Sequence, residues 1–223
     1  MGTMVWRQLP EAVYRQKVLD FLVREEGSVR HVYVDSVGVP TLGIGKALVV
    51  KGKQGWVVDP VGEDFLKQAA GQEYTLEQRR VLARVVENLR MLGAGGKARE
   101  AHVPLVHGPE VPVGSSVAAW RARMNPVYSR FGVLLALEEE VTFNQLVVGL
   151  SERGVPLWVP FSEERVALVS LYHNAPRVVA GVLPLLRLGD VAGAVRVIRR
   201  SGVGKGAVLM ARRGREAGVL AGV

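Results

Sequence analysis

Three side chains near the start of the sequence, Glu26, Asp35 and Thr41, have types and spacing suited to acid–base chemistry. Glu26 falls in the last turn of a predicted helix, where unpaired carbonyls and the negative end of the helix dipole disfavour an ionised carboxylate. It is therefore a candidate proton donor. Asp35 and Thr41 are equidistant from Gly38. In a hairpin centred on that glycine, they would face each other across the two strands.

An acid, a carboxylate and a hydroxyl are the groups that hydrolysis of a glycosidic bond requires, because one group protonates the leaving oxygen while another activates water. Gly43 and Gly45 would lie on the same strand face as Thr41 and would let a ligand or another backbone approach closely. The same spacing also fits a helix end followed by an ordinary hairpin, since two acids nine residues apart are common. The spacing alone leaves both interpretations open.

The hydrophobic pattern predicts the helix and the hairpin that would carry these side chains. Apolar residues recur at helical offsets within 10–26, and Gly27 is a typical helix stop. Alternation over 31–35 and over 39–45, with a turn between them, predicts a β-hairpin. The residues expected on the core-facing side of this hairpin are Val32, Val34, Leu42 and Ile44.

The remaining sequence predicts an α+β protein that is mostly helical. One helix is expected at 75–92, followed by a loop-rich passage at 93–116. Further helices are expected at 137–150, 162–174, 178–187, 191–200 and 207–220. We therefore expect an N-terminal lobe of helix and hairpin over 1–46, an insertion or accessory subdomain of uncertain structure over 47–135, and a joining helix with a helical lobe over 136–223.

The composition is that of a globular protein with an excess of positive charge. The absence of cysteine excludes disulfides and thiolate metal sites, and the sequence shows neither a signal peptide nor a transmembrane segment. The net charge of +8 fits either plain solubility or attraction to polyanions such as nucleic acid and anionic envelope polymers. A solvated basic face is the simplest interpretation of the C-terminal cations Arg196, Arg199, Arg200, Lys205, Arg212, Arg213 and Arg215.

Other motifs argue against a cofactor. The segments 43–46 and 202–205 lack both the earlier glycine and the Ser or Thr of a phosphate-binding loop, so no nucleotide is expected. The four histidines show no spacing typical of a metal site, so no metal is expected either. Trp56, Trp120 and Trp158 could stack on sugars, although a position in the core is the commoner role of tryptophan.

The opening residues also follow a family pattern. Glu-Gly, five residues, Tyr-x-Asp and then Gly-x-x-Thr-x-Gly-x-Gly resembles the catalytic signature of the phage-type lysozymes, glycoside hydrolase family 24, which are the endolysins of tailed bacteriophages. All eight signature positions are occupied here, by Glu26, Gly27, Tyr33, Asp35, Gly38, Thr41, Gly43 and Gly45. Lys46 stands where the family pattern usually continues with His.

Later segments carry the same resemblance. Residues 137–150, with Phe143-Asn144-Gln145, look like the helix that joins the two lobes in this family. Residues 161–174 look like the central helix of its C-terminal lobe, and "RLGDVAGAVRVIRR" and "ARRGREAGVL" are similar to its closing helices. Nothing in the family pattern explains the extra residues within 47–135.

The resemblance implies a lysozyme-like two-lobed fold and an inverting muramidase. Its substrate would be bacterial peptidoglycan, cleaved at the β-1,4 bond between N-acetylmuramic acid and N-acetylglucosamine. Glu26 would be the general acid, Asp35 the carboxylate that orients water, and Thr41 the hydroxyl that helps to position that water. The residues expected to contact the substrate are Tyr33, Gly43, Gly45 and Asn174. The reaction would need no cofactor, and we expect a monomer.

Three alternatives stay open. A lytic transglycosylase would use Glu26 alone and release anhydro sugars without water. A virion-associated lysozyme would share the chemistry and differ in delivery, whereas an endolysin would be made in the host cytoplasm without a signal peptide and reach the wall after holin-type release. A non-catalytic basic module would bind the envelope or nucleic acid and would survive the change of Glu26 to Gln.

Overall fold

The computed structural model describes residues 4–35, 39–53, 55–91, 131–132, 134–204 and 206–223. The fold is α+β and mostly helical, as the sequence predicts. Contacts divide the chain into two compact units. The helical unit comprises Met1–Glu26 and Gln145–Val223, and the sheet unit comprises Gly27–Asn144. This division differs from the predicted boundaries, because the first helix joins the C-terminal helices and the hairpin joins the segment that follows it.

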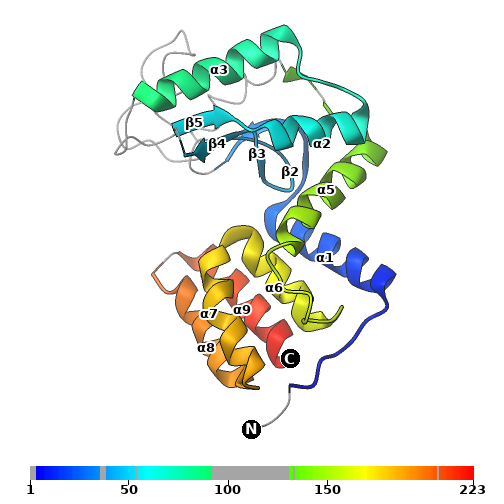
Figure 1. Ribbon diagram of the computed structural model, residues 1–223, viewed down its shortest axis with the longest axis vertical. Helices are drawn as coiled ribbons and strands as arrows, with labels where there is room; N and C mark the ends of the chain where they lie inside the picture. The colour runs from blue at the N-terminus through cyan, green and yellow to red at the C-terminus, as the bar shows by residue number, and fades with distance from the viewer. Residues whose placement is uncertain (1–3, 36–38, 54, 92–130, 133, 205) are drawn as a thin grey trace. The chain divides into compact units, whose positions relative to one another are not determined.

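The helical unit is built around one buried helix (Figure 1). Residues 164–171 of that helix, α6 (Glu163–Asn174), are all buried. The helices that pack against it are α1 (Glu11–Glu26), α7 (Pro176–Arg187) and α9 (Ala207–Ala221). Ser162 begins the helix, since its side chain accepts a hydrogen bond from the backbone N–H of Arg165 at 3.2 Å. The helices of this unit are α1 (Glu11–Glu26), the second half of α5 (Leu137–Glu152), α6 (Glu163–Asn174), α7 (Pro176–Arg187), α8 (Val191–Gly202) and α9 (Ala207–Ala221).

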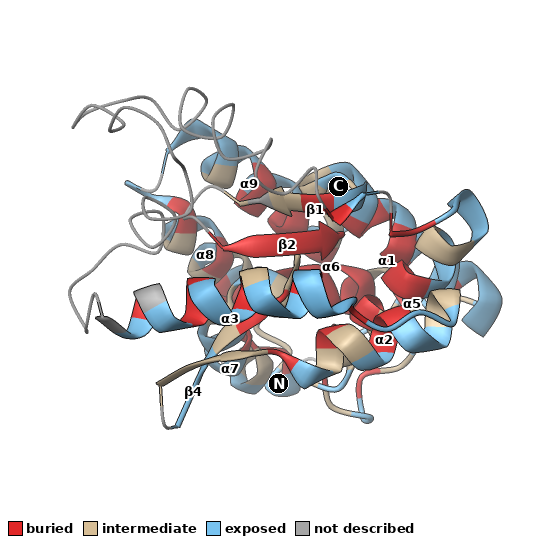
Figure 2. Cartoon of the chain, turned by 90° about the horizontal axis from the view of Figure 1, so that it is seen from above, coloured by how far each residue is buried: buried red, intermediate tan, exposed pale blue. Residues whose placement is uncertain are grey.

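The sheet unit contains two small antiparallel sheets and the helices that cover them (Figure 1). One sheet has the order β1-β2-β3, and the other is the hairpin β4-β5, on which α3 packs. Strand β2 is buried along its whole length (Figure 2). The elements are β1 (Val29–Val34), β2 (Pro40–Gly43), β3 (Lys46–Ala47), β4 (Val49–Gly52), β5 (Gly55–Val58), α2 (Pro60–Ala70), α3 (Leu76–Met91) and the first half of α5.

The predicted helices are confirmed, with ends that differ by two residues at most. Strand β3, the β4-β5 hairpin and α2 were not predicted. Leu42, Ile44 and Val32 are buried as expected on the core-facing side of the first sheet. The predicted turn at 36–38, the loop at 93–116, Trp120 and the side chain of Val34 lie outside the described residues. Among the described helices, none combines the length and the apolar character that a bilayer span needs.

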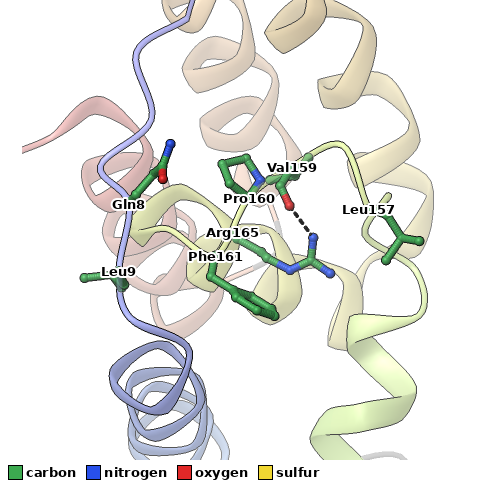
Figure 3. A pocket seen from close by; sticks show the side chains of 7 residues that line it. All are labelled: Gln8, Leu9, Leu157, Val159, Pro160, Phe161 and Arg165. Carbon is green, nitrogen blue, oxygen red and sulfur yellow. Dashed lines mark hydrogen bonds between the residues drawn. The ribbon is translucent and has the colours of Figure 1, made fainter.

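A buried arginine fixes the loop between α5 and α6. Arg165 donates from Nη1 to the carbonyl oxygens of Val159, at 2.6 Å, and Pro156, at 3.0 Å, and from Nε to the Tyr14 hydroxyl at 3.2 Å. The ion pairs found among the described residues do not include Arg165, so its charge is balanced by neutral oxygens. It lines a cavity of about 330 Å³ whose other wall is the segment at Gln8 and Leu9 (Figure 3).

Tyr14 and Tyr74 offer a matched test of buried hydroxyl groups. Both rings are almost fully buried, and burial raises the pKa of each phenol far above its ordinary value, so both stay neutral. The Tyr14 hydroxyl accepts a hydrogen bond from Arg165, whereas the Tyr74 hydroxyl has no hydrogen-bond partner among the described residues. The two hydroxyl groups should therefore contribute oppositely to stability.

We expect Tyr14→Phe to lower the free energy of unfolding by about 1–3 kcal/mol, because Arg165 would lose an acceptor for a buried charged donor. Tyr74→Phe should leave the free energy of unfolding unchanged or raise it by up to ~1 kcal/mol, because it removes a buried polar atom to which no described residue forms a hydrogen bond. Chemical denaturation of both variants measures the difference. Equal destabilisation by the two changes would contradict this assignment.

Candidate active site

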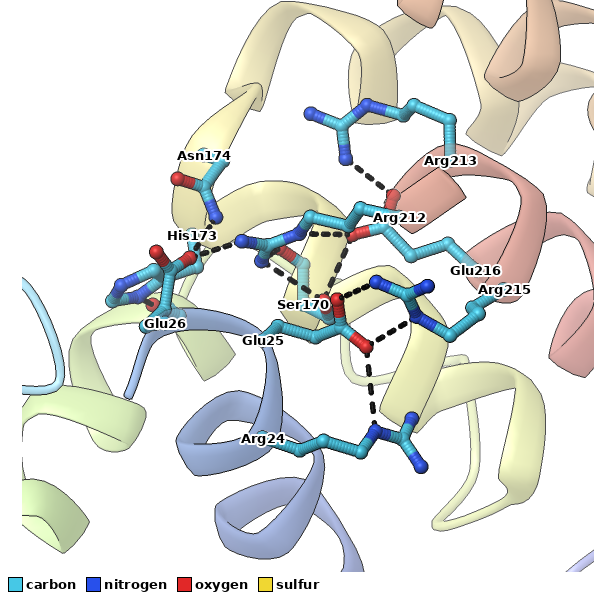
Figure 4. A network of polar contacts seen from close by, with 11 residues as sticks. Arg24, Glu25, Glu26, Ser170, His173, Asn174, Arg212, Arg213, Arg215 and Glu216 are labelled. Carbon is cyan, nitrogen blue, oxygen red and sulfur yellow. Dashed lines mark hydrogen bonds and ion pairs between the residues drawn. The ribbon is translucent and has the colours of Figure 1, made fainter. Parts of the chain in front are cut away.

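Glu26 lies at the C-terminal end of α1, and two side chains from other helices hold its carboxylate. Gly27 follows with φ of 71°, a conformation that favours glycine and ends the helix as predicted. The Glu26 Oε1 atom accepts hydrogen bonds from Nδ2 of Asn174, at the end of α6, and from Nη1 of Arg212, on α9 (Figure 4). The structure thus brings together two of the predicted site residues, Glu26 and Asn174, and adds Arg212, which was not predicted for the site.

Arg212 is itself held in place by a buried polar network (Figure 4). Its Nε donates to Glu216 Oε1 at 3.1 Å, and its Nη2 donates to the Ser170 carbonyl oxygen at 3.2 Å. Glu216 is fully buried, accepts a hydrogen bond from the Ser170 hydroxyl at 2.8 Å, and forms a second ion pair with Arg213. The orientation of the Glu26 carboxylate therefore depends on contacts that tie α9 to α6.

This network corrects the interpretation of the C-terminal cations as one solvated basic face. Arg212 and Arg213 are only 6% and 3% exposed, and both pair with Glu216. Arg215 is half exposed and pairs with Glu25 at 2.6 Å. The prediction was wrong because it considered the cations without the carboxylates near them in the sequence. Arg212 and Glu216 have the (i, i+4) spacing typical of a helical ion pair.

The predicted pairing of Asp35 with Thr41 is wrong. Tyr33 lies opposite Thr41, and Val34 lies opposite Pro40. Asp35 instead pairs with Val39: its backbone N–H donates to the Val39 carbonyl oxygen at 3.0 Å, and its Oδ1 accepts from the Val39 N–H at 2.8 Å. The carboxylate of Asp35 thus closes the chain reversal, which moves the centre of the hairpin one residue towards the N-terminus.

Asp35 and Thr41 remain linked through Val39. The Thr41 hydroxyl donates to the Val39 carbonyl oxygen at 2.8 Å, and Thr41 is only 2% exposed. The hydroxyl hydrogen is therefore already used, so its oxygen is the atom left to accept a hydrogen bond. Both candidate residues are positioned by the backbone of a single residue, Val39, at the end of β1 and β2 where the chain reverses.

The glycines after Thr41 hold the hairpin against α5. A Cβ atom on Gly43 would lie 2.6 Å from Asn144 Oδ1 and 2.8 Å from Phe143 Cδ1, so only glycine fits there. Asn144 accepts from the Ile44 N–H at 3.1 Å and donates to the Ser28 hydroxyl at 2.8 Å. The sequence left open whether a ligand or another part of the chain approaches Gly43 closely, and the structure shows that the side chains of Phe143 and Asn144 do so. Gly45 is exposed in the turn before β3, with φ of 89°.

Lys46, which departs from the family pattern, ties the first sheet to α2. Its ammonium group pairs with Asp59 Oδ2, and both side chains are largely buried. Asp59 also caps α2, since its Oδ1 accepts from the Val61 N–H at 3.2 Å. One aspartate thus serves both the helix N-terminus and the lysine of β3.

The candidate residues fall in both units. Glu26 and Asn174 belong to the helical unit, whereas Tyr33, Asp35, Thr41, Gly43 and Gly45 belong to the sheet unit. The convergence of Glu26 with Asp35 and Thr41 therefore stays a prediction. The described residues contain no group of three or more His, Asp or Glu side chains that could hold a metal ion.

Glu25, the neighbour of Glu26, should make stability depend on acid pH. Burial acts to raise the pKa of Glu25, but the hydrogen bonds and charge of Arg215, with the charges of Arg212 and Arg24, hold the pKa below its ordinary value of 4.5. The carboxylate form is therefore favoured by folding. This contribution is complete above the ordinary pKa and is lost as the pH falls through the lower pKa of the folded state.

We expect Arg215→Met to lower the melting temperature near pH 7 and to have a progressively smaller effect as the pH falls below about 4. The physical reason is that protonated Glu25 gains little from the guanidinium. Thermal unfolding of both proteins across this pH range measures the difference, with Arg196→Met, a change to a cation on α8, as the control. A destabilisation that does not vary with pH would contradict the prediction.

Comparison of the chain with protein-family models, with curated protein sequences and with solved structures yields no match.

Proposed function

We propose that the protein is a peptidoglycan hydrolase that cleaves the β-1,4 bond between N-acetylmuramic acid and N-acetylglucosamine with inversion. The observation that carries this proposal is the spacing of Glu26, Asp35 and Thr41 within the eight-position signature. The position of Glu26 supports it, because its carboxylate ends a helix and is oriented by Asn174 and Arg212. The hairpin supports it as well, since Val39 holds Asp35 and Thr41 together.

In the proposed reaction, Glu26 donates a proton to the oxygen of the leaving sugar. A positioned acid of this kind contributes about 10²–10⁴-fold to the rate. Orientation matters because proton transfer requires hydrogen-bond geometry, and Asn174 and Arg212 restrict the carboxyl group to one direction. Asn174, at the exposed end of α6, is also a candidate contact for the sugar.

Asp35 would orient the attacking water, accept the proton that this water loses as its oxygen bonds to the anomeric carbon, and balance the positive charge that develops on the sugar ring. Inverting enzymes hold their two carboxyl groups about 6.5–9.5 Å apart to leave room for this water. Thr41 would accept a hydrogen bond from the same water, because its own hydrogen is donated to Val39. Tyr33, opposite Thr41, would lie beside the bound sugar.

The test is digestion of purified sacculi by the wild-type protein, followed as turbidity, with mass spectrometry and NMR of the soluble fragments. We expect reducing muramic acid ends that are released first as the inverted, α anomer. Anhydro-muramic acid ends would instead identify a lytic transglycosylase. Binding of the protein to sacculi without release of soluble fragments would instead indicate a non-catalytic module that binds the envelope. Delivery from the host cytoplasm after holin-type release, or with the virion, belongs to the same proposal.

A further inference from the structure

A second surface of the helical unit has the chemistry of a carbohydrate site. A cavity of about 510 Å³ lies between the loop that follows α5 and the outer side of α7. Ligand sites commonly have volumes of about 300–1,000 Å³. The residues that line the cavity are Pro156, Trp158, Ala180, Leu183, Pro184 and Arg187.

The pattern of α7 explains why this face is open. The helix buries Val179, Val182 and Leu186 against the unit. The lining residues at 180, 183, 184 and 187 follow a second stripe at offsets of three, four and seven, so they share one side of the helix, next to the buried side. An apolar stripe that the protein leaves open in this way is typical of a binding surface.

Trp158 is a preorganised platform in this cavity. Its side chain is exposed, at 37%. The ring of Trp6 packs against it edge-on, with centroids 6.1 Å apart and an angle of 67°. The guanidinium of Arg187 lies 5.1 Å from its ring centroid. An aromatic ring that is held before binding loses little conformational entropy when a ligand stacks on it.

We propose that Trp158 and Arg187 form an accessory site for the anionic glycan on which the enzyme acts. The apolar C–H face of a pyranose ring stacks on tryptophan, while a guanidinium donates paired hydrogen bonds to hydroxyl groups and carboxylates. Peptidoglycan supplies both, since its sugars carry peptides with free carboxylates. The lining residues include no acid, and the net charge is +8, so an anionic polymer is favoured.

This inference rests on the proposed function for the identity of the polymer. A site of this kind raises avidity, because a strand held at Trp158 keeps its other sugars at a high local concentration around the enzyme. It should therefore affect binding to long, insoluble glycan far more than cleavage of a short soluble oligosaccharide. A lipid surface is disfavoured, because the stripe carries one cation and forms a depression rather than a protruding apolar face.

The experiment measures co-sedimentation with purified sacculi in a Glu26→Gln background, so that cleavage does not remove the polymer. We expect Trp158→Ala and Arg187→Gln to weaken binding roughly tenfold each. Leu157→Ala is the matched control, because Leu157 is an exposed apolar neighbour that does not line the cavity. In the active background, the same variants should lose clearing of sacculi while keeping turnover of a soluble oligosaccharide.

Melting temperatures close to that of the parent show that the variants fold, and Arg187→Gln, at an exposed position, remains informative if Trp158→Ala does not fold. Unchanged sacculus binding by folded variants would overturn the inference, and so would a loss of binding confined to anionic phospholipid vesicles. If the wild-type protein cleaves no glycan yet binds sacculi through Trp158, the proposed reaction fails while the accessory site stands. The two proposals are thus tested separately.

Discussion

Glu26→Gln should abolish clearing of sacculi, with a loss of about 10³-fold or more in rate. The amide cannot donate the proton that the leaving oxygen needs, and a positioned acid contributes up to about 10⁴-fold. The fold should be nearly unaffected, because glutamine keeps an oxygen that can accept from Asn174 and Arg212. Turbidity of a sacculus suspension measures the activity, and thermal unfolding measures the stability.

The adjacent carboxylate provides the control for this prediction. Glu25 lies in the last turn of the same helix and forms a two-pronged ion pair with Arg215, at 2.7 and 2.6 Å, but has no role in the proposed reaction. We expect Glu25→Gln to lower the melting temperature and to leave clearing largely intact. The pair of variants therefore separates loss of the acid from loss of an ion pair. Lysis retained by Glu26→Gln would remove Glu26 from the role of general acid.

The helices could be predicted because their signals are local. The helix expected at 162–174 is Glu163–Asn174, and its start is set by the Ser162 cap. The helix at Pro60–Ala70 was missed although Asp59 followed by Pro60 is a start signal, because Gly62 and the nearby glycines suggested a loop. Gly62 is buried within the helix, where a Cβ atom would make an ordinary contact with Leu48 at 3.4 Å, so its presence in the sequence does not mark a loop.

The hairpin shows why a correct burial pattern does not fix strand pairing. Asp35 was expected opposite Thr41, but Tyr33 occupies that position. The partner of Thr41 thus moves by two residues, and side chains alternate with a period of two, so each keeps its face. Leu42 is buried as predicted despite the wrong partner, although Thr41 and Gly43 on the other face of β2 are buried as well. The hydrogen bond between the Asp35 carboxylate and the Val39 N–H, which decides the pairing, has no signature in hydrophobic alternation.

Two members of the candidate site were predicted from the family pattern, and a third was missed because its place there depends on burial. Glu26 and Asn174 lie together as one group in the helical unit. Arg212 appeared to be one cation among many, because the sequence does not show that it is buried beside Glu216. The net charge can be summed from the sequence, whereas the contribution of each charge to stability depends on which charged groups are buried together in the fold.

Glu216→Ala should cause the largest loss of stability among these variants, about 3–5 kcal/mol in the free energy of unfolding. Glu216 is fully buried and pairs with Arg212 and Arg213. Its removal takes away the carboxylate that pairs with Arg213 and leaves Arg212 with Glu26 as its ion-pair partner among the described residues. Clearing of sacculi should fall as well, since Arg212 would no longer be held towards Glu26. Denaturation with urea measures the stability, and the turbidity assay measures the activity.

Glu11→Ala is the matched control, because Glu11 and Arg15 form an ion pair at the same (i, i+4) spacing on an exposed helix surface. Their side chains are 55% and 60% exposed, and such pairs contribute less than about 1 kcal/mol. The two carboxylates share their charge and an (i, i+4) arginine, and they differ in burial and in the second ion pair of Glu216 with Arg213. If both changes lower the free energy of unfolding equally, the stabilisation by Glu216 comes from helical spacing alone. Glu216 would then not hold Arg212 in place.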